Sequence, residues 1–204
     1  MKILRVFLLL ILLTSFSCSS TKKQKENTEV KMERPKYEIT VFQSGAELGK
    51  IIIETFPTEA PKHAANFDSL VAIGFYNGTA FHRVIPGFMI QGGDPNTKNF
   101  PDDRSRWGMG DPSQTRVPAE FNRELPDWKH RRGILSAARS QDPNSATSQF
   151  FIMHGDAPTL DGQYSIYGQV LEGIEVVDII ATTPRNPRDA PDETVTMQIR
   201  KLNK

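Results

Sequence analysis

The chain has 204 residues with 25 Lys or Arg and 24 Asp or Glu, so its formal net charge is +1. This length fits one domain with an extension, and the near-zero charge excludes the strongly basic surface that a nucleic-acid partner would require. A single cysteine excludes an internal disulfide, a multi-cysteine zinc site and an iron–sulfur cluster.

The first 17 residues have the order of a secretory signal: the cations Lys2 and Arg5, the apolar stretch Val6–Leu13, and then mostly small side chains. The apolar stretch is shorter than the ~20 residues of a membrane span, so we expect residues 1–17 to be cleaved off. Cys18 would then begin the mature chain, and a cysteine at this place resembles the lipobox of bacterial lipoproteins. The resemblance implies that Cys18 is lipidated and that the lipid anchors the chain in a membrane.

Two alternatives to lipidation stay open: an ordinary signal peptide followed by an incidental cysteine, and a signal that is retained as an anchor. The lipobox match departs from the common pattern, because Ser15 stands where Leu is usual and Phe16 is bulky. Ser19, rather than Asp, after the cysteine favours sorting to the outer membrane. The predicted location is therefore the bacterial cell envelope, with the chain facing the periplasm.

Residues 18–36 are expected to be a lipidated cysteine followed by a flexible basic tether. Six cations and three anions accompany only two apolar side chains, Val30 and Met32, between residues 19 and 36. Such a segment buries too little apolar surface to offset the entropy that is lost on ordering. Contact of its cations with phosphate headgroups is the alternative to a solvated tether. The remainder, residues 37–204, is expected to be a single domain.

Short segments rich in β-branched and aromatic residues dominate this domain, and the chain's 14 Gly and 14 Pro punctuate them. Eight segments are expected to be strands: Tyr37–Gln43, Leu48–Glu54, Phe81–Ile85, Phe88–Gly92, Gly133–Ala138, Gln149–Met153, Ile166–Val170 and Thr194–Lys201. Two segments have helical spacing, Pro61–Ile73 and Ile174–Ala181. Because strands outnumber helices by about four to one, the pattern predicts a mainly β fold, a closed antiparallel barrel capped by two helices.

The first helical segment and the longest loop differ in how clearly their sequences predict a structure. In Pro61–Ile73 the apolar residues fall on one face, Ile73 extends that face, and Gly74 is expected to cap the helix. By contrast, Pro95–Asn122 has no periodicity, and a loop of this length in a compact domain is usually functional or mobile.

Familiar catalytic patterns are absent from the sequence. The four histidines are scattered without metal-ligand spacing, no G-x-S-x-G elbow is present, and no glycine-rich stretch has the spacing of a phosphate loop. Hydrolase, kinase and dehydrogenase chemistry is therefore excluded, and no metal or cofactor is expected.

What remains is the segment FHRVIPGFMIQGGD, residues 81–94. In a strand, Arg83 shares a face with Phe81 and Ile85, and a Pro-Gly turn returns the chain toward it. A guanidinium keeps its charge in proteins, so Arg83 needs either an anionic partner or a pocket that is open to water. A structural arginine at a barrel rim and a functional arginine are both compatible with this spacing.

Residues 81–94 and four further motifs resemble the cyclophilin-type peptidyl-prolyl cis-trans isomerases. The further motifs are GILSAAR at 133–139, SQFFI at 148–152, LDGQYSIYGQV at 160–170 and GIEVVD at 173–178. The resemblance extends over the chain from Tyr37 onward, and SATSQFF at 145–151 is closer to the bacterial branch. It implies an eight-stranded antiparallel barrel capped by two helices, with rotamase activity on X–Pro bonds in peptides and folding proteins.

The resemblance also assigns roles to residues. Arg83 is the catalytic donor toward the prolyl nitrogen, Gln91 orients it, and Phe88 and Phe151 complete the catalytic set. The substrate-binding residues that it implies are His82, Met89, Ala138, Arg139, Gln149, Leu160 and Tyr164. Phe150, which faces the opposite way in a strand, is expected in the core.

Three departures from the family affect specificity and leave the catalytic set intact. Thr159 stands where many members have Trp, so cyclosporin-like inhibitors are expected to bind weakly. Tyr164 stands where eukaryotic members often have His. The loop 139–148 is one residue longer than in eukaryotic members, and its Arg139 is expected to alter the preference beside the proline.

The first hypothesis is an active isomerase, expected to be a monomer, that acts on proline-containing polypeptides of the envelope. The alternative is a non-catalytic proline-binding or scaffold lipoprotein, and a third is a barrel that serves only as a spacer. Retention of Arg83, Gln91 and Phe151 favours the first hypothesis.

Overall fold

The structure is a computed structural model that describes residues 34–121 and 127–203. The predicted signal peptide, Cys18 and most of the predicted tether lie outside the described residues. Arg34 already contacts the domain, because its guanidinium forms an ion pair with Glu54 at 3.1 Å. The ordered domain therefore includes a few residues before Tyr37.

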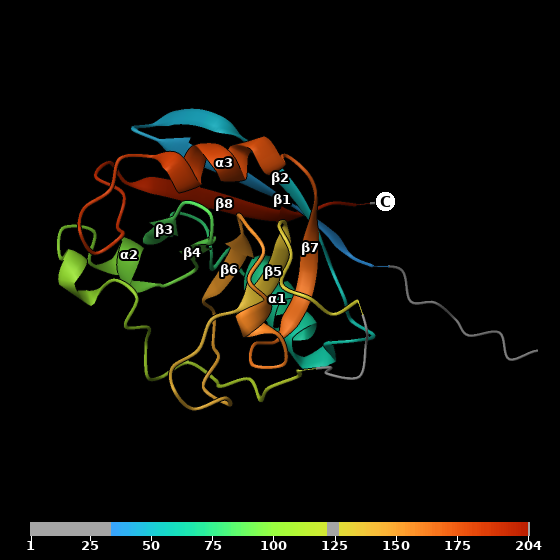
Figure 1. Ribbon diagram of the computed structural model, residues 1–204. Coiled ribbons are helices and arrows are strands. Elements are labelled where there is room, and N and C mark those ends of the chain that lie inside the picture. Colours follow the sequence, from blue (N-terminus) through green and yellow to red (C-terminus); the bar gives the residue numbers. More distant parts are fainter. Residues whose placement is uncertain (1–33, 122–126, 204) are drawn as a thin grey trace, which may run out of the picture. The chain divides into compact units, whose positions relative to one another are not determined.

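Eight antiparallel strands form one sheet in the order β3-β4-β6-β5-β7-β2-β1-β8 (Figure 1). The strands are β1 (Lys36–Gln43), β2 (Ala46–Thr55), β3 (Arg83–Ile85), β4 (Met89–Gly92), β5 (Ile134–Ala137), β6 (Phe150–Met153), β7 (Ile166–Glu172) and β8 (Val195–Lys201). Each of them falls on a segment that the sequence predicts to be a strand, so the mainly β, antiparallel class is confirmed.

The predicted closure of the barrel is wrong, since the sheet is a half-barrel that stays open between β3 and β8. In the described residues this seam is crossed by one isolated bridge, Ala80 to Thr196, beside backbone hydrogen bonds from residues 78–81 to β8. Beyond this bridge the N–H of Thr79 donates to the Tyr76 carbonyl at 3.0 Å instead of to β8, so the ladder does not continue. With three residues, β3 also has little backbone to pair.

Two longer helices lie on opposite sides of the strands, α1 (Pro61–Ala72) against β7 and β8, and α3 (Ile174–Thr182) against β2, β3 and β4 (Figure 1). Helix α1 ends before Gly74, whose φ of 67° and N–H bond to the Val71 carbonyl are typical of a helix terminus. Ile73 therefore lies beyond the helix and is 75% exposed, so it does not extend the buried face as predicted. No described helix is long and apolar enough to cross a bilayer.

The larger buried cluster, which we call the main core, is formed by the inner face of the sheet together with α1 and α3. Phe67 of α1 lies within it. The centroid of its ring is 5.1 to 6.0 Å from the centroids of four other aromatic rings, those of Tyr37, Tyr76, Phe150 and Tyr167. Aromatic pairs at such distances stabilise a core by ~0.5–1.5 kcal/mol each beyond the area that they bury.

The aperiodic loop contains only short helical turns in its described part, residues 95–121, namely α2 (Asn96–Asn99) and the 3-10 turn η1 (Arg104–Arg106). Asp94, which is wholly buried, anchors its first half. The carboxylate accepts hydrogen bonds from the N–H groups of Asn96, Gly108 and Gly110. These donors provide the solvation that a buried carboxylate requires.

Glu120 anchors the other end of this loop. Its carboxylate accepts hydrogen bonds from the N–H groups of Lys62 and His63, each at 3.0 Å, in the first turn of α1. The ring Nδ1 of His63 lies 2.6 Å from the same carboxylate. A negative charge at a helix N-terminus is favourable, so polar contacts secure a loop that buries few apolar side chains.

Candidate active site

Three of the side chains assigned to catalysis stand in one row across three neighbouring strands. Arg83 of β3 is directly opposite Gln91 of β4, and Gln91 is directly opposite Phe151 of β6. Residues that stand opposite each other in antiparallel strands project to the same face of the sheet. The strand register therefore brings Arg83, Gln91 and Phe151 together.

Alternation along β6 separates this face from the main core. Phe150 and Ile152 belong to the main core, as expected for Phe150, whereas Phe151 and Met153 belong to a second cluster. We call this second group the pocket cluster: Met89, Ala138, Phe151, Met153 and Ala157, with the partly buried Ile85, Phe88, Ile134, Leu160 and Tyr164 around them.

The pocket cluster borders a pocket of about 100 Å³. Its lining consists of Arg83, Phe88, Met89, Gln91, Ala138, Arg139, Phe151, Leu160 and Tyr164. All nine are among the residues assigned to the site from the sequence. The volume is well below the ~300 Å³ of pockets for drug-sized ligands, so the pocket has room for one small apolar ring.

Arg83 lies at the open side of this pocket. Its side chain is 45% exposed, and its Nε is 3.9 Å from the carboxylate of Asp189. An exposed pair at this separation is weak. The guanidinium therefore has both the water-facing pocket and the anionic partner that its charge requires, and it retains N–H donors for a ligand.

A residue that the sequence reasoning missed lies behind Phe151. The ring of His130 stacks on that of Phe151 with centroids 6.2 Å apart, and the ring of Tyr164 meets both edge-on. Burial lowers the pKa of the His130 imidazole, while the Asp161 carboxylate, 3.0 Å from its Nδ1, partly opposes this shift. A neutral His130 thus supports the aromatic wall of the pocket.

Arg139 borders the pocket, but its donors are engaged by the main chain. Its Nε and Nη2 donate to the carbonyl of Gln163 at 3.1 and 2.9 Å, and its Nη1 donates to the carbonyls of Ser140 and Gln141. The guanidinium also lies 4.4 Å from the centre of the Tyr164 ring. Arg139 therefore braces the loop 139–148 against the pocket wall.

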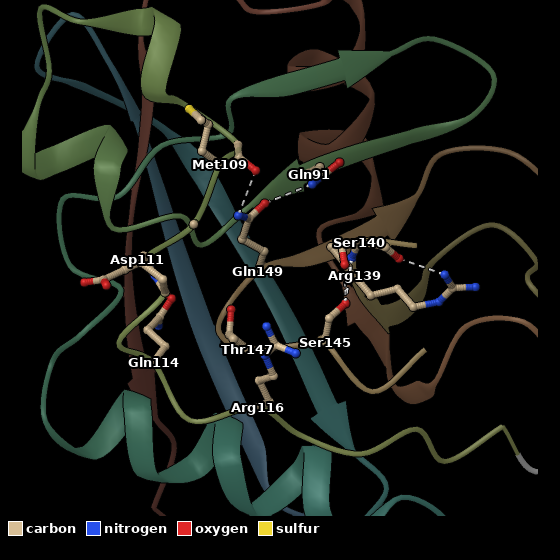
Figure 2. Close-up of a pocket in the computed structure, with 14 residues that line it drawn as sticks. Gln91, Met109, Asp111, Gln114, Arg116, Arg139, Ser140, Ser145, Thr147 and Gln149 are labelled. Atoms are coloured by element: carbon tan, nitrogen blue, oxygen red, sulfur yellow. Dashed lines mark hydrogen bonds between the residues drawn. The ribbon is translucent and has the colours of Figure 1, made fainter. Parts of the chain in front are cut away.

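Gln149 lines a second, larger pocket of about 310 Å³ (Figure 2). Its Oε1 accepts a hydrogen bond from Nε2 of Gln91 at 3.0 Å, and its Nε2 donates to the Gly108 carbonyl at 3.2 Å. The two pockets are adjacent, because Gln91, Ala138 and Arg139 line both of them.

The sequence reasoning missed most of the lining of the larger pocket. Those residues come from the loops around 108–116 and 140–147: Gly108, Met109, Gly110, Asp111, Pro112, Gln114, Arg116, Ser140, Ser145 and Thr147. The only signal was the length of the aperiodic loop 95–122, which indicates a functional segment without naming its residues.

His82 is the assigned residue that the structure does not bring to either pocket. Its side chain is buried near Gly108, and neither ring nitrogen has a hydrogen-bond partner among the described residues. Burial lowers the pKa of His82 to about 4, with the charge of Asp94 opposing the shift. Phe81 is also displaced: it is wholly buried in the main core, because the strand begins only at Arg83, so it does not share that residue's face.

Known proteins match both the sequence and the fold. The model of the family described as cyclophilin type peptidyl-prolyl cis-trans isomerase/CLD matches residues 39–202. A Brucella abortus protein named "Probable peptidyl-prolyl cis-trans isomerase" is 48% identical over 134 residues, which are 65% of this chain and 66% of that protein. The Arabidopsis thaliana peptidyl-prolyl cis-trans isomerase CYP18-1 is 47% identical over 146 residues, 71% of this chain and 84% of that protein.

Solved structures agree with these relatives. A crystal structure of a Cryptosporidium parvum cyclophilin type peptidyl-prolyl cis-trans isomerase has a TM-score of 0.70 and 31% identity, covering 84% of this chain and 99% of that one. A second structure of that protein, in the presence of the dipeptide Ala-Pro, has a TM-score of 0.68 and 32% identity, covering 83% of this chain and 99% of that one.

The family match spans well over half of the sequence, so this chain belongs to the cyclophilin-type peptidyl-prolyl cis-trans isomerase family. The resemblance drawn from the motifs and the predicted class of enzyme are thereby confirmed. The match covers about two thirds of the length of the Brucella relative. The roles of individual residues stay predictions.

Proposed function

We propose that this domain catalyses cis–trans isomerisation of X–Pro bonds in proline-containing polypeptides of the bacterial cell envelope. The observation that supports this most is the position of the half-exposed Arg83 beside a small apolar pocket bounded by Met89 and Phe151. The pocket suits a proline ring, and the arginine supplies a charged donor at its open side.

The chemistry requires no covalent intermediate. Rotation about the X–Pro bond faces a barrier of ~18–20 kcal/mol because of amide resonance. The enzyme lowers this barrier by binding the twisted state better than either planar isomer. Twisting makes the prolyl nitrogen basic, so Arg83 can donate a hydrogen bond to it, while Gln91, held by Gln149, keeps the arginine in place. A preorganised charged donor of this kind contributes ~3–4 kcal/mol.

The test is cis–trans exchange of a short X–Pro peptide, followed by NMR with catalytic amounts of the purified protein. We expect Arg83→Ala to lower kcat/KM about 10²- to 10³-fold. Arg83→Lys keeps the charge without the planar fork, so it should recover only part of the activity. Because Arg83 is half exposed, we expect the free energy of unfolding of both variants to stay within about 0.5 kcal/mol of the wild-type value.

A wild-type protein that binds the peptide without accelerating exchange would contradict this proposal. The non-catalytic proline-binding or scaffold lipoprotein would then be the better description. Equal activity of wild type and Arg83→Ala would instead remove Arg83 from its assigned role.

The envelope location in this proposal depends on Cys18, which lies outside the described residues. It is supported by the secretory order of residues 1–17 and by the position of the chain's only cysteine directly after them. Two or more acyl chains at Cys18 would provide the stable anchoring that one chain does not. The domain would then act as a monomer in the periplasm, tethered to the outer membrane.

Lipidation is tested by expressing the full chain in a bacterial host. We expect the wild type to partition into detergent and to migrate differently in electrophoresis from Cys18→Ser, which should stay in the aqueous phase. Identical partitioning of the two proteins would show that Cys18 is not the anchor. The activity of the domain does not depend on this outcome.

A further inference from the structure

The β3–β4 turn carries Phe88 to the small pocket and joins the strands of Arg83 and Gln91. Gly87, within the turn, has a φ of 77°, and the N–H of Phe88 donates to the Ile85 carbonyl at 3.0 Å. A three-residue strand offers this hairpin few internal hydrogen bonds. Contacts from outside the hairpin therefore decide where Phe88 stands relative to the pocket.

The segment that follows β6, His154 and Gly155, makes such contacts with the turn. The N–H groups of both residues donate to the Phe88 carbonyl, at 2.9 and 3.2 Å. The N–H of Gly87 donates in turn to Nδ1 of His154 at 2.7 Å. Gly155 approaches so closely that an added Cβ would lie 2.3 Å from the Gly87 carbonyl oxygen. Three hydrogen bonds and a close contact thus fix the turn.

The hydrogen bond from Gly87 determines the protonation of the His154 ring. A backbone N–H can only donate, so Nδ1 must carry a lone pair, and the ring proton of the neutral imidazole is on Nε2. That nitrogen lies 3.1 Å from Oδ1 of Asp178 on α3. The ring therefore accepts a hydrogen bond from the turn and places its second nitrogen close to a carboxylate of the helix.

The carboxylate of Asp178 is itself held in place by the guanidinium of Arg132. Nη2 of Arg132 donates to its Oδ2 at 2.8 Å, and Nη1 of the same arginine donates to the carbonyl of His154 at 2.9 Å. The His154 side chain is 17% exposed. Arg132 and Asp178 thus hold both the backbone and the ring of His154, which leaves the ring little freedom to leave Gly87.

We propose that His154 is a positioning residue of the isomerase, which fixes the β3–β4 turn to α3 and so sets the place of Phe88 in the proline pocket. This inference rests on the proposed function of that pocket. Phe88 bounds the site where the proline ring binds, whereas Arg83 acts on the nitrogen. Loss of the contact from His154 to Gly87 should therefore raise KM more than it lowers kcat.

Two substitutions test the contacts of the two ring nitrogens separately. In His154→Asn the amide oxygen can take the place of Nδ1 and accept from Gly87, while the contact with Asp178 is lost. In His154→Gln the amide reaches toward Asp178, and the acceptor for Gly87 is lost. We expect His154→Gln to raise KM for an X–Pro peptide about three- to tenfold, the effect of one hydrogen bond, and His154→Asn to stay within about twofold of wild type.

The amide of Gly87 gives a readout that is independent of activity. Its hydrogen exchange should be faster in His154→Gln and close to wild type in His154→Asn. A wild-type KM in the Gln variant, or equal losses in both variants, would overturn the positioning role. If the wild type does not accelerate cis–trans exchange of the peptide, the proposed function is wrong. Hydrogen exchange of the Gly87 amide still shows in that case whether His154 holds the turn.

Discussion

The main core and the pocket cluster share strands β4 and β6, yet they differ in how completely their side chains are buried. In the main core Phe67 is 1% exposed and Phe150 is 0% exposed, and helices complete the burial. In the pocket cluster Phe88, Leu160 and Tyr164 remain only partly buried around an open pocket. Apolar burial on one face of the sheet stabilises the fold. On the other face, the apolar surface that remains exposed is available to a ligand.

Phe150 and Phe151 are a matched pair for testing this difference, because they are adjacent and project to opposite faces. We expect Phe150→Ala to lower the free energy of unfolding by about 3–5 kcal/mol, since it leaves a cavity in a closed core. Phe151→Ala should cost at most about half as much, because its space opens to solvent, but it should lower kcat/KM at least tenfold. Urea unfolding and the NMR exchange assay measure the two effects.

Equal stability losses in the two variants would show that the pocket cluster is as closed as the main core. Unchanged activity in Phe151→Ala would show that this ring is not part of the proline pocket. Either result would remove the distinction between the two clusters.

His82 is buried and lines neither pocket, so its titration should affect stability rather than binding. Its pKa is about 4 in the folded protein, against about 6.5 for an ordinary imidazole. Between these values the unfolded state binds more protons, so the free energy of unfolding falls as the pH falls, by about 3 kcal/mol from pH 6.5 to 4. Urea unfolding at both pH values should show a smaller loss in His82→Leu. A loss as large as that of wild type would contradict the assignment.

Glu120 tests whether the loop beside the larger pocket depends on polar anchors rather than on the main core. Glu120→Ala removes an acceptor for two N–H groups of α1 and for the His63 ring. We expect a loss of about 2 kcal/mol, with faster hydrogen exchange confined to the loop and the first turn of α1. Faster exchange throughout the main core would contradict the local role of this anchor.

Local patterns were sufficient to predict the strands, because alternation and β-branching act over a few residues. They could not predict whether the barrel closes. The seam stays open where the N–H of Thr79 bonds to the Tyr76 carbonyl instead of to β8, and where β3 has only three residues. The exposure of Ile73 has a similar origin, since the left-handed Gly74 sets the end of the helix rather than apolar periodicity.

The site was predictable wherever its residues belong to long motifs. Arg83 and Gln91 meet because a short hairpin aligns them, and this follows from the spacing of two strands around a turn. The family resemblance assigned His82 to the site, but its side chain is buried away from both pockets. Phe81 was misplaced because strand alternation was extended to a residue before the strand begins. His130 and Asp161 are 31 residues apart, and only the tertiary fold brings their side chains together behind the pocket.

The open seam has a consequence for a protein that works among unfolded chains. An unpaired sheet edge is a template on which an extended polypeptide can add and begin an aggregate. Here the free side of β8 is occupied by residues 78–81, and the N–H of Val84 in β3 donates to the Asp189 carbonyl at 2.8 Å. The domain's own backbone thus covers β8 from Val195 to Met197 and engages one amide of β3. These contacts leave an extended polypeptide less free edge on which to pair, which favours release of a chain that binds at the proposed proline pocket.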